Sequence, residues 1–333
     1  MSVKKLPELE SLLSWLGKFP RHPAQTHAIH EADSEVIRIS KNLYLAATID
    51  SVSEEIAFRL YKDPYTMGWI TAMASLSDLA AVGAEPLGVL FSAQLSSELE
   101  ESARKRLADG FRDALKKTRT HLLGGDSGGA LSTVLSGVGL GLLDSKPTTR
   151  IGMRPGDLIC ITGKSGIGPA LGFRHLLGGA LDESLYRPHA RISEGIALRG
   201  IASSSMDTSD GIASTLHTLM TLNGVGLKLH PTSAHLDARA VQFCKEMNLP
   251  VSALWFGEHG DFELVFSVPE KKMPKLKRAL KNFSVIGKAT TKKAGTPLRL
   301  DFLADRPKSN LQEIRSSFDA AVEYLRTAPI NFE

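Results

Sequence analysis

The stretch "SSMDTSDGIAS" (204–214) places two aspartates three residues apart, Asp207 and Asp210, beside small hydroxyl residues and just ahead of Gly211. An aspartate in such a setting usually caps a helix or makes a turn, because its side chain accepts bonds from backbone N–H groups. Four other short stretches also set an aspartate beside Ser, Thr or Gly: "TIDS", "LSDLAAVGA", "LGGDSGG" and "HGDFEL". Fold and function both depend on whether these stretches are separate turns or parts of one dispersed site.

The length and composition indicate an ordinary globular protein. At 333 residues the chain is long for one hydrophobic core, which predicts two domains. Its 42% hydrophobic and 23% charged residues are typical of a folded, water-exposed chain. The net charge of +4 is mild and spread out, and no basic block is interleaved with aromatic residues, so the sequence does not favour a nucleic-acid partner.

No segment indicates export or membrane insertion. The N-terminal "MSVKKLPELESLLSWLGKFP" is typical of an amphipathic helix and lacks the apolar core and cleavage site of a signal peptide. No run approaches the ~18–20 apolar residues of a membrane span. The two cysteines, Cys160 and Cys244, lie far apart and suggest neither a disulfide framework nor a metal site. We therefore expect a cytoplasmic protein without a membrane partner.

Hydrophobic patterning divides the chain into two α/β (α+β) halves. Residues 30–149 alternate strands, such as "EVIRI" and "LYLAATIDS", with a small-residue helix and an amphipathic helix. The segment "THLLGGDSGGALSTVLSGVGLGLL" reads as strand, glycine turn, strand. A Pro/Gly turn in "RIGMRPGD" marks the boundary to a second α/β domain over 150–300. Residues 1–29 are predicted to be a helical extension, and 301–333 a helical tail.

Three of the aspartates stand at positions that a simple turn does not explain. Asp50 follows the apolar run "LYLAATI", Asp126 ends "HLLGGD", and Asp78 sits among Ala and Leu in a helical pattern. A carboxylate in such surroundings is costly unless it is paired or bound to a metal. Carboxylates gathered at buried ends of elements are what Mg²⁺ requires, and Mg²⁺ usually bridges them to nucleotide phosphates.

Glycine-rich turns and scattered basic residues could serve a phosphate. "GGDSGG" and "GKSGIG" permit close backbone approach and expose N–H groups. "GKSGIG" lacks the spacing of a Walker loop, so it is either a phosphate cradle or a plain strand-to-helix turn. The basic candidates are Lys164, Arg150 and Arg191. His259 stands beside the "GDFEL" element, and no pattern supports covalent nucleophilic catalysis.

The order of the motifs resembles the thiamine-monophosphate kinases. From about residue 30 to 290 the chain reads "TIDS", "SLSDLAAVGAEP", "GGDSGG", "RIGMRPGDLICITG", "RPHARISEG", "MDTSDGIASTL", "GDFELVF" and "VIGKA". More broadly, the chain is similar to the ATP-using superfamily of aminoimidazole ribonucleotide synthetase, selenophosphate synthetase and the hydrogenase-maturation carbamoyl dehydratase. Within that superfamily, "SDLAAVGA" and "MDTSDGIA" favour the thiamine-phosphate branch.

This resemblance implies a two-domain fold like that of aminoimidazole ribonucleotide synthetase. The N-terminal domain would pair with its twin in a homodimer, with ATP near that interface, and the C-terminal domain would complete the cleft. Carried over by motif, the candidate Mg²⁺ ligands are Asp33, Asp50, Asp78, Asp126, Asp207 and Asp210. The candidate nucleotide-binding residues are Gly124, Gly125, Asp126, Arg150, Thr48 and Ser209. Asp50, Ser209 and Asp210 are the catalytic candidates, and Glu54, Phe58, Asp261 and Phe262 the substrate candidates.

The chain departs from the family pattern mainly on the acceptor side. The family's Gly-Asp-Asp-Ala-Ala element reads "EADSEV" here, so that Ala32 replaces the first carboxylate. The family's Val-Glu-Gly-Val-His-Phe reads "SEEIAF", with Ala57 in place of histidine. Its Gly-Gly-Glu-Asp-Tyr-Glu-Leu reads "EHGDFEL", with Gly260 for Glu and Phe262 for Tyr. Losing a carboxylate would reduce the number of metals or weaken ATP binding.

The sequence therefore favours an ATP- and Mg²⁺-dependent kinase that converts thiamine monophosphate to thiamine diphosphate in thiamine biosynthesis. Two alternatives stay open. In one, the enzyme phosphorylates or activates a different small molecule, as the loss of the histidine at Ala57 suggests. In the other, the chain is a non-catalytic paralogue that binds nucleotide without turnover, as Ala32 and Gly260 suggest.

Overall fold

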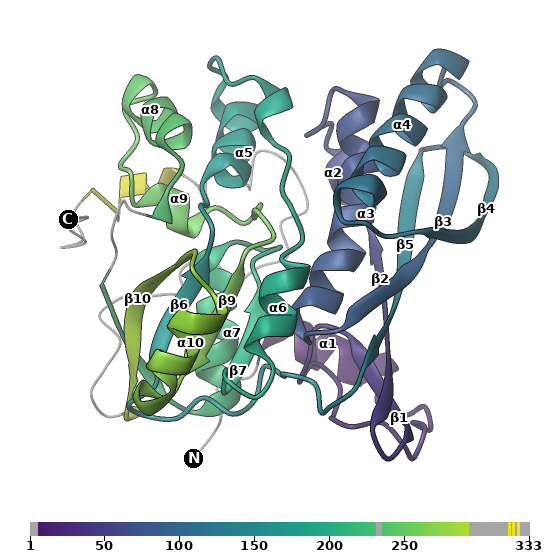
Figure 1. Ribbon diagram of the computed structural model, residues 1–333. Coiled ribbons are helices and arrows are strands. Elements are labelled where there is room, and N and C mark those ends of the chain that lie inside the picture. The colour runs from purple at the N-terminus through teal and green to yellow at the C-terminus, as the bar shows by residue number, and fades with distance from the viewer. Residues whose placement is uncertain (1–5, 231–234, 293–318, 321, 324, 327–333) are drawn as a thin grey trace.

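The computed structural model describes residues 6–230, 235–292, 319–320, 322–323 and 325–326 and contains two five-stranded sheets (Figure 1). The expected α/β fold is therefore confirmed. Most of the helical tail predicted for 301–333 lies outside the described residues. Within the described part of the chain, no helix is both long enough and apolar enough to cross a membrane.

The first sheet is built from the N-terminal half of the chain. Its strands are β1 (Glu35–Ser40), β2 (Leu43–Ser51), β3 (Glu85–Ser96), β4 (Leu122–Ala130) and β5 (Val134–Leu143). They lie in the order β1-β2-β5-β3-β4, and only the β3–β4 pair is parallel. The parallel pair needs a crossover, which α4 (Glu101–Lys117) supplies between the two strands.

The second sheet is built from the C-terminal half. Its strands are β6 (Leu158–Thr162), β7 (Ser204–Asp207), β8 (Gly226–Leu229), β9 (Leu264–Val268) and β10 (Phe283–Thr290), in the order β7-β9-β6-β10-β8. Every pair in it is antiparallel. The remaining helices are α1 (Pro7–Trp15), α2 (Ser53–Ala57), α5 (Ile167–Leu177), α6 (Ile192–Leu198), α7 (Ile212–Asn223), α8 (Ala238–Glu246), α9 (Ala253–Phe256) and α10 (Met273–Ala279), with short 3-10 turns at Glu183–Leu185 and Glu270–Lys272.

Helix α3 (Pro64–Ala81) is the element that joins the two halves. It begins at Pro64, where the preceding Asp63 side chain caps the helix by accepting from the N–H of Tyr65. It packs on β2 and β5 of the first sheet and also contacts α6 and β7 of the second half (Figure 1). Most of its residues are buried because it is covered on both sides. Side chains of its last turns therefore reach both sheets.

Close packing of α3 on α4 depends on glycine. A Cβ at Gly68 would collide with the backbone carbonyl of Leu107, and one at Gly110 would collide with that of Tyr65. Only glycine lets the two helix backbones approach this closely. The close approach fixes α3 against the sheet and, with it, the position of the site described below.

The outer face of the first sheet is apolar, and none of the described helices packs on it. Burial alternates strictly along β5, and its less buried side chains share one face with exposed side chains of neighbouring strands. A row across the sheet runs from Ile49 through Val138 to Leu90, which are paired in register. Ile49 is 68% exposed and Leu90 37% exposed. An apolar face of this kind marks an interaction surface.

Two segments differ from their sequence-based description. "GGDSGG" is not a turn, because it runs inside β4 as an extended edge strand, and the turn comes later, at residues 131–133. Pairing with β3 overrides the low strand propensity of glycine. In the other segment, residues 204–207 form β7, with Asp207 as its last residue. The sequence Ser-Ser-Met-Asp has no alternating strand pattern, yet all four residues are buried.

Candidate functional site

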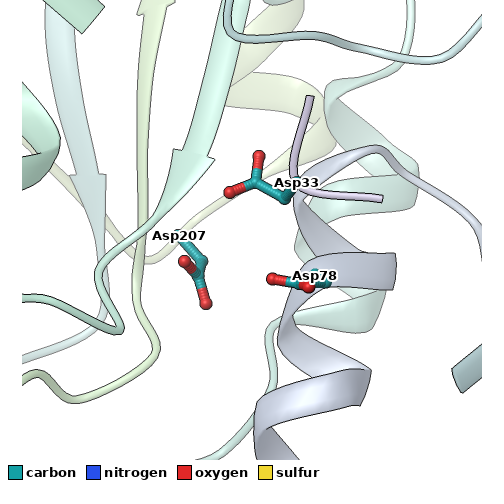
Figure 2. A group of neighbouring side chains, drawn as sticks. All are labelled: Asp33, Asp78 and Asp207. Atoms are coloured by element: carbon teal, nitrogen blue, oxygen red, sulfur yellow. The ribbon is translucent and has the colours of Figure 1, made fainter. Parts of the chain in front are cut away.

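Three carboxylates from distant parts of the chain converge between the two sheets. Asp33 precedes β1, Asp78 lies in the last turn of α3, and Asp207 ends β7. One oxygen of each lies within 4.8 Å of the others, and Figure 2 shows the three side chains directed toward a common point. Carboxylates this close repel one another unless a proton or a cation lies between them.

Asp207 is held by two serine hydroxyls. Ser77, on α3, donates to Oδ2 at 2.6 Å, and Ser209 donates to Oδ1 at 2.9 Å. Ser209, one of the predicted nucleotide-binding residues, therefore lies directly beside the cluster. These bonds fix the orientation of the carboxylate, and each oxygen keeps further acceptor capacity.

The other two carboxylates are positioned in the same way. The hydroxyl of Thr48, on β2, donates to Oδ2 of Asp78. Arg150 donates from Nη2 to Oδ1 of Asp33 at 3.1 Å, and its side chain also contacts the ring of His30. Arg150 thus holds a metal-ligand candidate in place and is itself 12% exposed, at the wall of the cleft.

The electrostatics of the cluster disfavour several negative charges. Burial raises the pKa of Asp207 to about 7, with the charge of Asp33 adding to the shift and the bond from Ser77 opposing it. Burial also raises the pKa of Asp78 well above its usual range, and the charges of Asp50 and Asp207 raise it further. The pKa of Asp50 is raised by burial as well. Holding these groups together without a cation therefore raises the free energy of the folded state.

Two buried oxygens in this cluster are unsatisfied. Oδ2 of Asp33 and Oδ2 of Asp50 have no hydrogen-bond partner among the described residues, although the Asp33 side chain is 0% exposed. Buried polar atoms almost always have partners, so such atoms need an explanation. Hard divalent cations take oxygen ligands from carboxylates, and this set of crowded, orphaned oxygens fits Mg²⁺.

The cluster opens into a cleft of about 780 Å³. The predicted site residues that line it are Asp33, Thr48, Asp50, Asp78, Arg150, Ser209, Asp210 and Phe262. Asp207 is buried directly behind this wall. The structure thus brings together most of the metal-ligand candidates, all three catalytic candidates and one substrate candidate. Leu16 and Phe19 of the N-terminal segment also line the cleft.

The predicted nucleotide strand lies elsewhere in this copy of the chain. Gly124, Gly125 and Asp126 belong to β4, at the edge of the first sheet farthest from β1, and do not line the cleft. Figure 1 shows β4 at the outer side of the molecule, remote from the second sheet. Gly125 and Asp126 are exposed. A single copy therefore does not join these residues to the carboxylate cluster.

The structure also separates three substrate candidates from the cleft. Glu54 and Phe58 are exposed and do not line it. Asp261 is buried and accepts bonds from the hydroxyl of Ser165 and from the backbone N–H groups of Gly166 and Gly168, at 2.7, 2.7 and 2.8 Å. These contacts hold the loop that leads into α5.

The same bonds answer the question about "GKSGIG". Two of its backbone N–H groups already donate to Asp261, so the structure favours a plain strand-to-helix turn over a phosphate cradle. Arg191 is likewise engaged, because its Nε donates to Oε2 of the buried Glu263 at 2.7 Å. Neither Arg191 nor Lys164 lines the cleft.

Glu55, Tyr61 and His259 are polar residues that line the cleft and were not among the site candidates. Glu55 lies on α2, and the hydroxyl of Tyr61 contacts Nε2 of His259 at 3.2 Å. Burial lowers the pKa of His259 to about 4, so its ring is neutral near pH 7. Its position beside "GDFEL" was the one available signal. Nothing in the local pattern "SEEIAF" distinguished Glu55 from its neighbour Glu54.

Comparisons with known proteins agree with the fold and with the motif order. A family model for the AIR synthase related protein, N-terminal domain, matches residues 31–143. The thiamine-monophosphate kinase of Buchnera aphidicola (subsp. Acyrthosiphon pisum) is 32% identical over 272 residues, covering 78% of this chain and 83% of the relative. That of Methanocaldococcus jannaschii is 30% identical, covering 77% and 84%. Among solved structures, AaThiL complexed with AMPPCP and TMP superposes with a TM-score of 0.71 at 22% identity, covering 85% of this chain and 90% of that one.

Proposed function

The chain belongs to the thiamine-monophosphate kinase family of ATP-dependent phosphotransferases, and from this premise we propose that it phosphorylates thiamine monophosphate with ATP and Mg²⁺. The products would be thiamine diphosphate and ADP. The relative solved in complex with AMPPCP and TMP supports a cleft that receives both a nucleotide and an acceptor. Membership of the family shows neither which acceptor this chain uses nor which metal it binds.

The observation that carries the proposal is the cluster of Asp33, Asp78 and Asp207 at the base of the cleft. These three carboxylates, together with those of Asp50 and Asp210 in the cleft lining, would hold Mg²⁺. Bound there, the metal would neutralise triphosphate charge and align the γ-phosphate with the acceptor. Without that cation the carboxylates would repel the triphosphate as well as one another. A bound cation would remove both repulsions.

The chain's own residues would then position the reactants. Ser77 and Thr48 keep the carboxylates in fixed orientations, and Arg150 holds Asp33. In the reaction, a phosphate oxygen of the acceptor attacks the γ-phosphorus, a new P–O bond forms, and the bond to the β-phosphate oxygen breaks to release ADP. The attacking oxygen is already anionic, so no general base is required, and catalysis consists of positioning and electrostatics.

The nucleotide side of the proposal includes a homodimer. The outer face of the first sheet is apolar, and Ile49 belongs both to this face and to the lining of the cleft. A second copy seated on this face would cover Ile49, Val138 and Leu90 and would border the cleft. That arrangement would give Gly124, Gly125 and Asp126 a way to contact ATP beside the cleft of a partner, which they lack within one copy.

The direct test is an assay with ATP, excess Mg²⁺ and thiamine monophosphate, in which thiamine diphosphate and ADP are both quantified by chromatography. We expect equal amounts of the two products and no thiamine diphosphate when Mg²⁺ is chelated. Asp50→Asn should lower kcat by at least about a hundredfold, as loss of a metal ligand in phosphoryl transfer does. Wild-type turnover that persists in EDTA would contradict the metal assignment.

One structural observation keeps a different acceptor as the second candidate. Ala57, at the position of the family's histidine, is exposed and does not line the cleft, whereas Tyr61 and the neutral His259 do. The acceptor wall therefore differs in chemistry from the family's motif. Release of ADP with other small phosphorylated acceptors, but not with thiamine monophosphate, would favour this candidate. Nucleotide binding without ADP release for any acceptor would favour a non-catalytic paralogue.

A further inference from the structure

His259 is a titratable residue of the cleft that the proposed phosphoryl transfer does not use. It lines the cleft with Tyr61 and Phe262, and we call these three residues the aromatic wall. The hydroxyl of Tyr61 lies 3.2 Å from Nε2 of His259. The His259 ring also packs against the buried ring of Tyr186, with the two centroids 4.9 Å apart. Contacts from two tyrosines therefore hold the imidazole in one orientation.

The contact with Tyr61 leaves one nitrogen of the imidazole for a ligand. Burial lowers the pKa of His259 to about 4, so near pH 7 the ring is neutral and has one donor and one acceptor nitrogen. Nε2 is engaged by Tyr61 in either tautomer. Within the part of the chain that the structure describes, the ring makes no second hydrogen bond. Nδ1 is therefore the polar atom that His259 can offer to a molecule in the cleft.

Backbone contacts hold His259 beside the carboxylate cluster. The N–H of the next residue, Gly260, donates to the carbonyl of Ser209 at 2.8 Å. A Cβ at Gly260 would lie 1.5 Å from the carbonyl oxygen of Thr208, so only glycine permits this approach. Ser209 in turn donates from its hydroxyl to Asp207. A ligand bound at His259 would therefore lie close to the place where the phosphoryl group is transferred.

Phe262 lines the same cleft in an unusual backbone conformation. Its φ is 57°, in the left-handed region that bulky side chains rarely adopt. Both of its neighbours are anchored, because Asp261 accepts from the start of α5 and Glu263 accepts from Arg191. Strained residues of this kind persist where the surroundings enforce them, and they are concentrated at ligand sites. Phe262 is thus a second and independent indication that a ligand binds at the aromatic wall.

The aromatic wall suits a planar heteroaromatic ring. Aromatic side chains pack favourably on flat rings, and Nδ1 of His259 adds one directed hydrogen bond to a ring nitrogen or an amino group. A sugar or an aliphatic chain would use only part of these contacts. We assign the ring to the acceptor rather than to ATP, because the nucleotide candidates Gly124 and Gly125 lie on β4 of the first sheet and do not line the cleft.

We propose that His259 determines acceptor specificity by hydrogen-bonding through Nδ1 to a heteroaromatic ring that packs on Tyr61 and Phe262. The inference rests on the proposed kinase function and adds to it a substrate class, a phosphorylated heteroaromatic compound, and the residue that selects it. Thiamine monophosphate belongs to this class, because its aminopyrimidine ring carries two ring nitrogens and an amino group.

Two substitutions of His259 separate the bond to the ligand from the bond to Tyr61. His259→Asn keeps a polar group at the position of Nδ1 but is too short to reach Tyr61. His259→Gln keeps one at the position of Nε2 and leaves that of Nδ1 empty. With thiamine monophosphate, we expect His259→Gln to raise the KM for the acceptor about tenfold at nearly constant kcat, and His259→Asn to stay within about threefold of the wild type.

A purely structural role of the bond to Tyr61 predicts the reverse order of the two variants. His175→Gln is the matched control, because His175 is a half-buried histidine of α5 that does not line the cleft. It should leave every kinetic constant unchanged. If thiamine diphosphate forms but both His259 variants keep the wild-type KM, or if the KM for ATP rises instead, the inference is overturned and the proposed function stands.

Other acceptors distinguish the remaining outcomes. If thiamine monophosphate is not phosphorylated, ADP release is measured with pyridoxine phosphate and with ribose phosphate. Release with pyridoxine phosphate, with the same order of the His259 variants, would support the inference and overturn thiamine monophosphate as the acceptor. Release with ribose phosphate alone, or with none of the three compounds, would overturn both the inference and the proposed function.

Discussion

The hydroxyl of Ser77 donates to Oδ2 of Asp207 at 2.6 Å and thereby connects the two halves of the molecule at the candidate site. Ser77 belongs to α3, which packs on the first sheet, and Asp207 ends a strand of the second sheet. Both residues are buried. The bond fixes a carboxylate from one half relative to Asp78, which is next to Ser77 in sequence, and so sets the spacing of the cluster.

Ser77→Ala should destabilise the protein by about 2 kcal/mol, the cost of removing a hydrogen bond to a buried carboxylate. The free energy of unfolding from urea titrations is the measurement. Ser75→Ala is the matched control, because Ser75 is buried on the same helix but donates only to the backbone carbonyl of Thr71, at 3.5 Å. If both variants lose the same free energy of unfolding, the bond to Asp207 stabilises the fold no more than the long bond of Ser75 does.

Without a divalent cation, stability should fall as the pH rises. Burial raises the pKa of Asp207 from 3.8 to about 7, so between these values the folded state binds more protons than the unfolded state. The free energy of unfolding should therefore decline by roughly 2–4 kcal/mol between about pH 4 and pH 7, and the decline extends higher because the pKa of Asp78 is raised well above its usual range.

Urea unfolding in EDTA across this pH range measures the effect. Adding Mg²⁺ should restore stability near neutral pH, because a cation that binds only the folded state stabilises it by mass action. Asp207→Asn, which cannot ionise, should make the decline in EDTA shallower and leave the part that comes from Asp78. A stability that rises over the same pH interval, or that ignores Mg²⁺, would contradict the account of the cluster as a cation site.

Asp261→Asn should act on the fold rather than on the acceptor. Asp261 accepts from Ser165 and Gly166 at Oδ2 and from Gly168 at Oδ1, and asparagine has only one acceptor oxygen, so its NH2 group must face a donor at one of the two positions. We expect a loss of about 3 kcal/mol in the free energy of unfolding. The KM for the acceptor, measured on the fraction that folds, should stay near the wild-type value. A raised KM without loss of stability would instead indicate that Asp261 contacts the acceptor.

The fold class could be predicted from the sequence, and so could most of the carboxylates that the structure brings together at the cleft. Asp50 and Asp78 stand in apolar surroundings where an unpaired charge is costly, so their positions alone indicated a site. The pairing of β4 could not be read from "GGDSGG", because strand partners are distant in sequence and glycine has no strand preference of its own. Glu55 was invisible for a similar reason, since only the direction of the short helix α2 distinguishes it from Glu54.

Val138→Glu should separate the proposed homodimer into single copies. Val138 lies in the middle of β5, between Ile49 and Leu90 on the uncovered face, and a charge there would have to be buried by a second copy. Light scattering coupled to size-exclusion chromatography should give the dimer mass for the wild type and the monomer mass for the variant. Leu13→Glu, at an exposed apolar position on α1 outside this face, is the control and should leave the dimer intact. If Gly124, Gly125 and Asp126 reach ATP only across the interface, the Val138→Glu monomer should also bind nucleotide more weakly than the wild-type dimer. A monomeric wild-type protein would contradict the proposed dimer. A monomeric variant with unchanged nucleotide affinity would show that the second copy does not contribute to nucleotide binding.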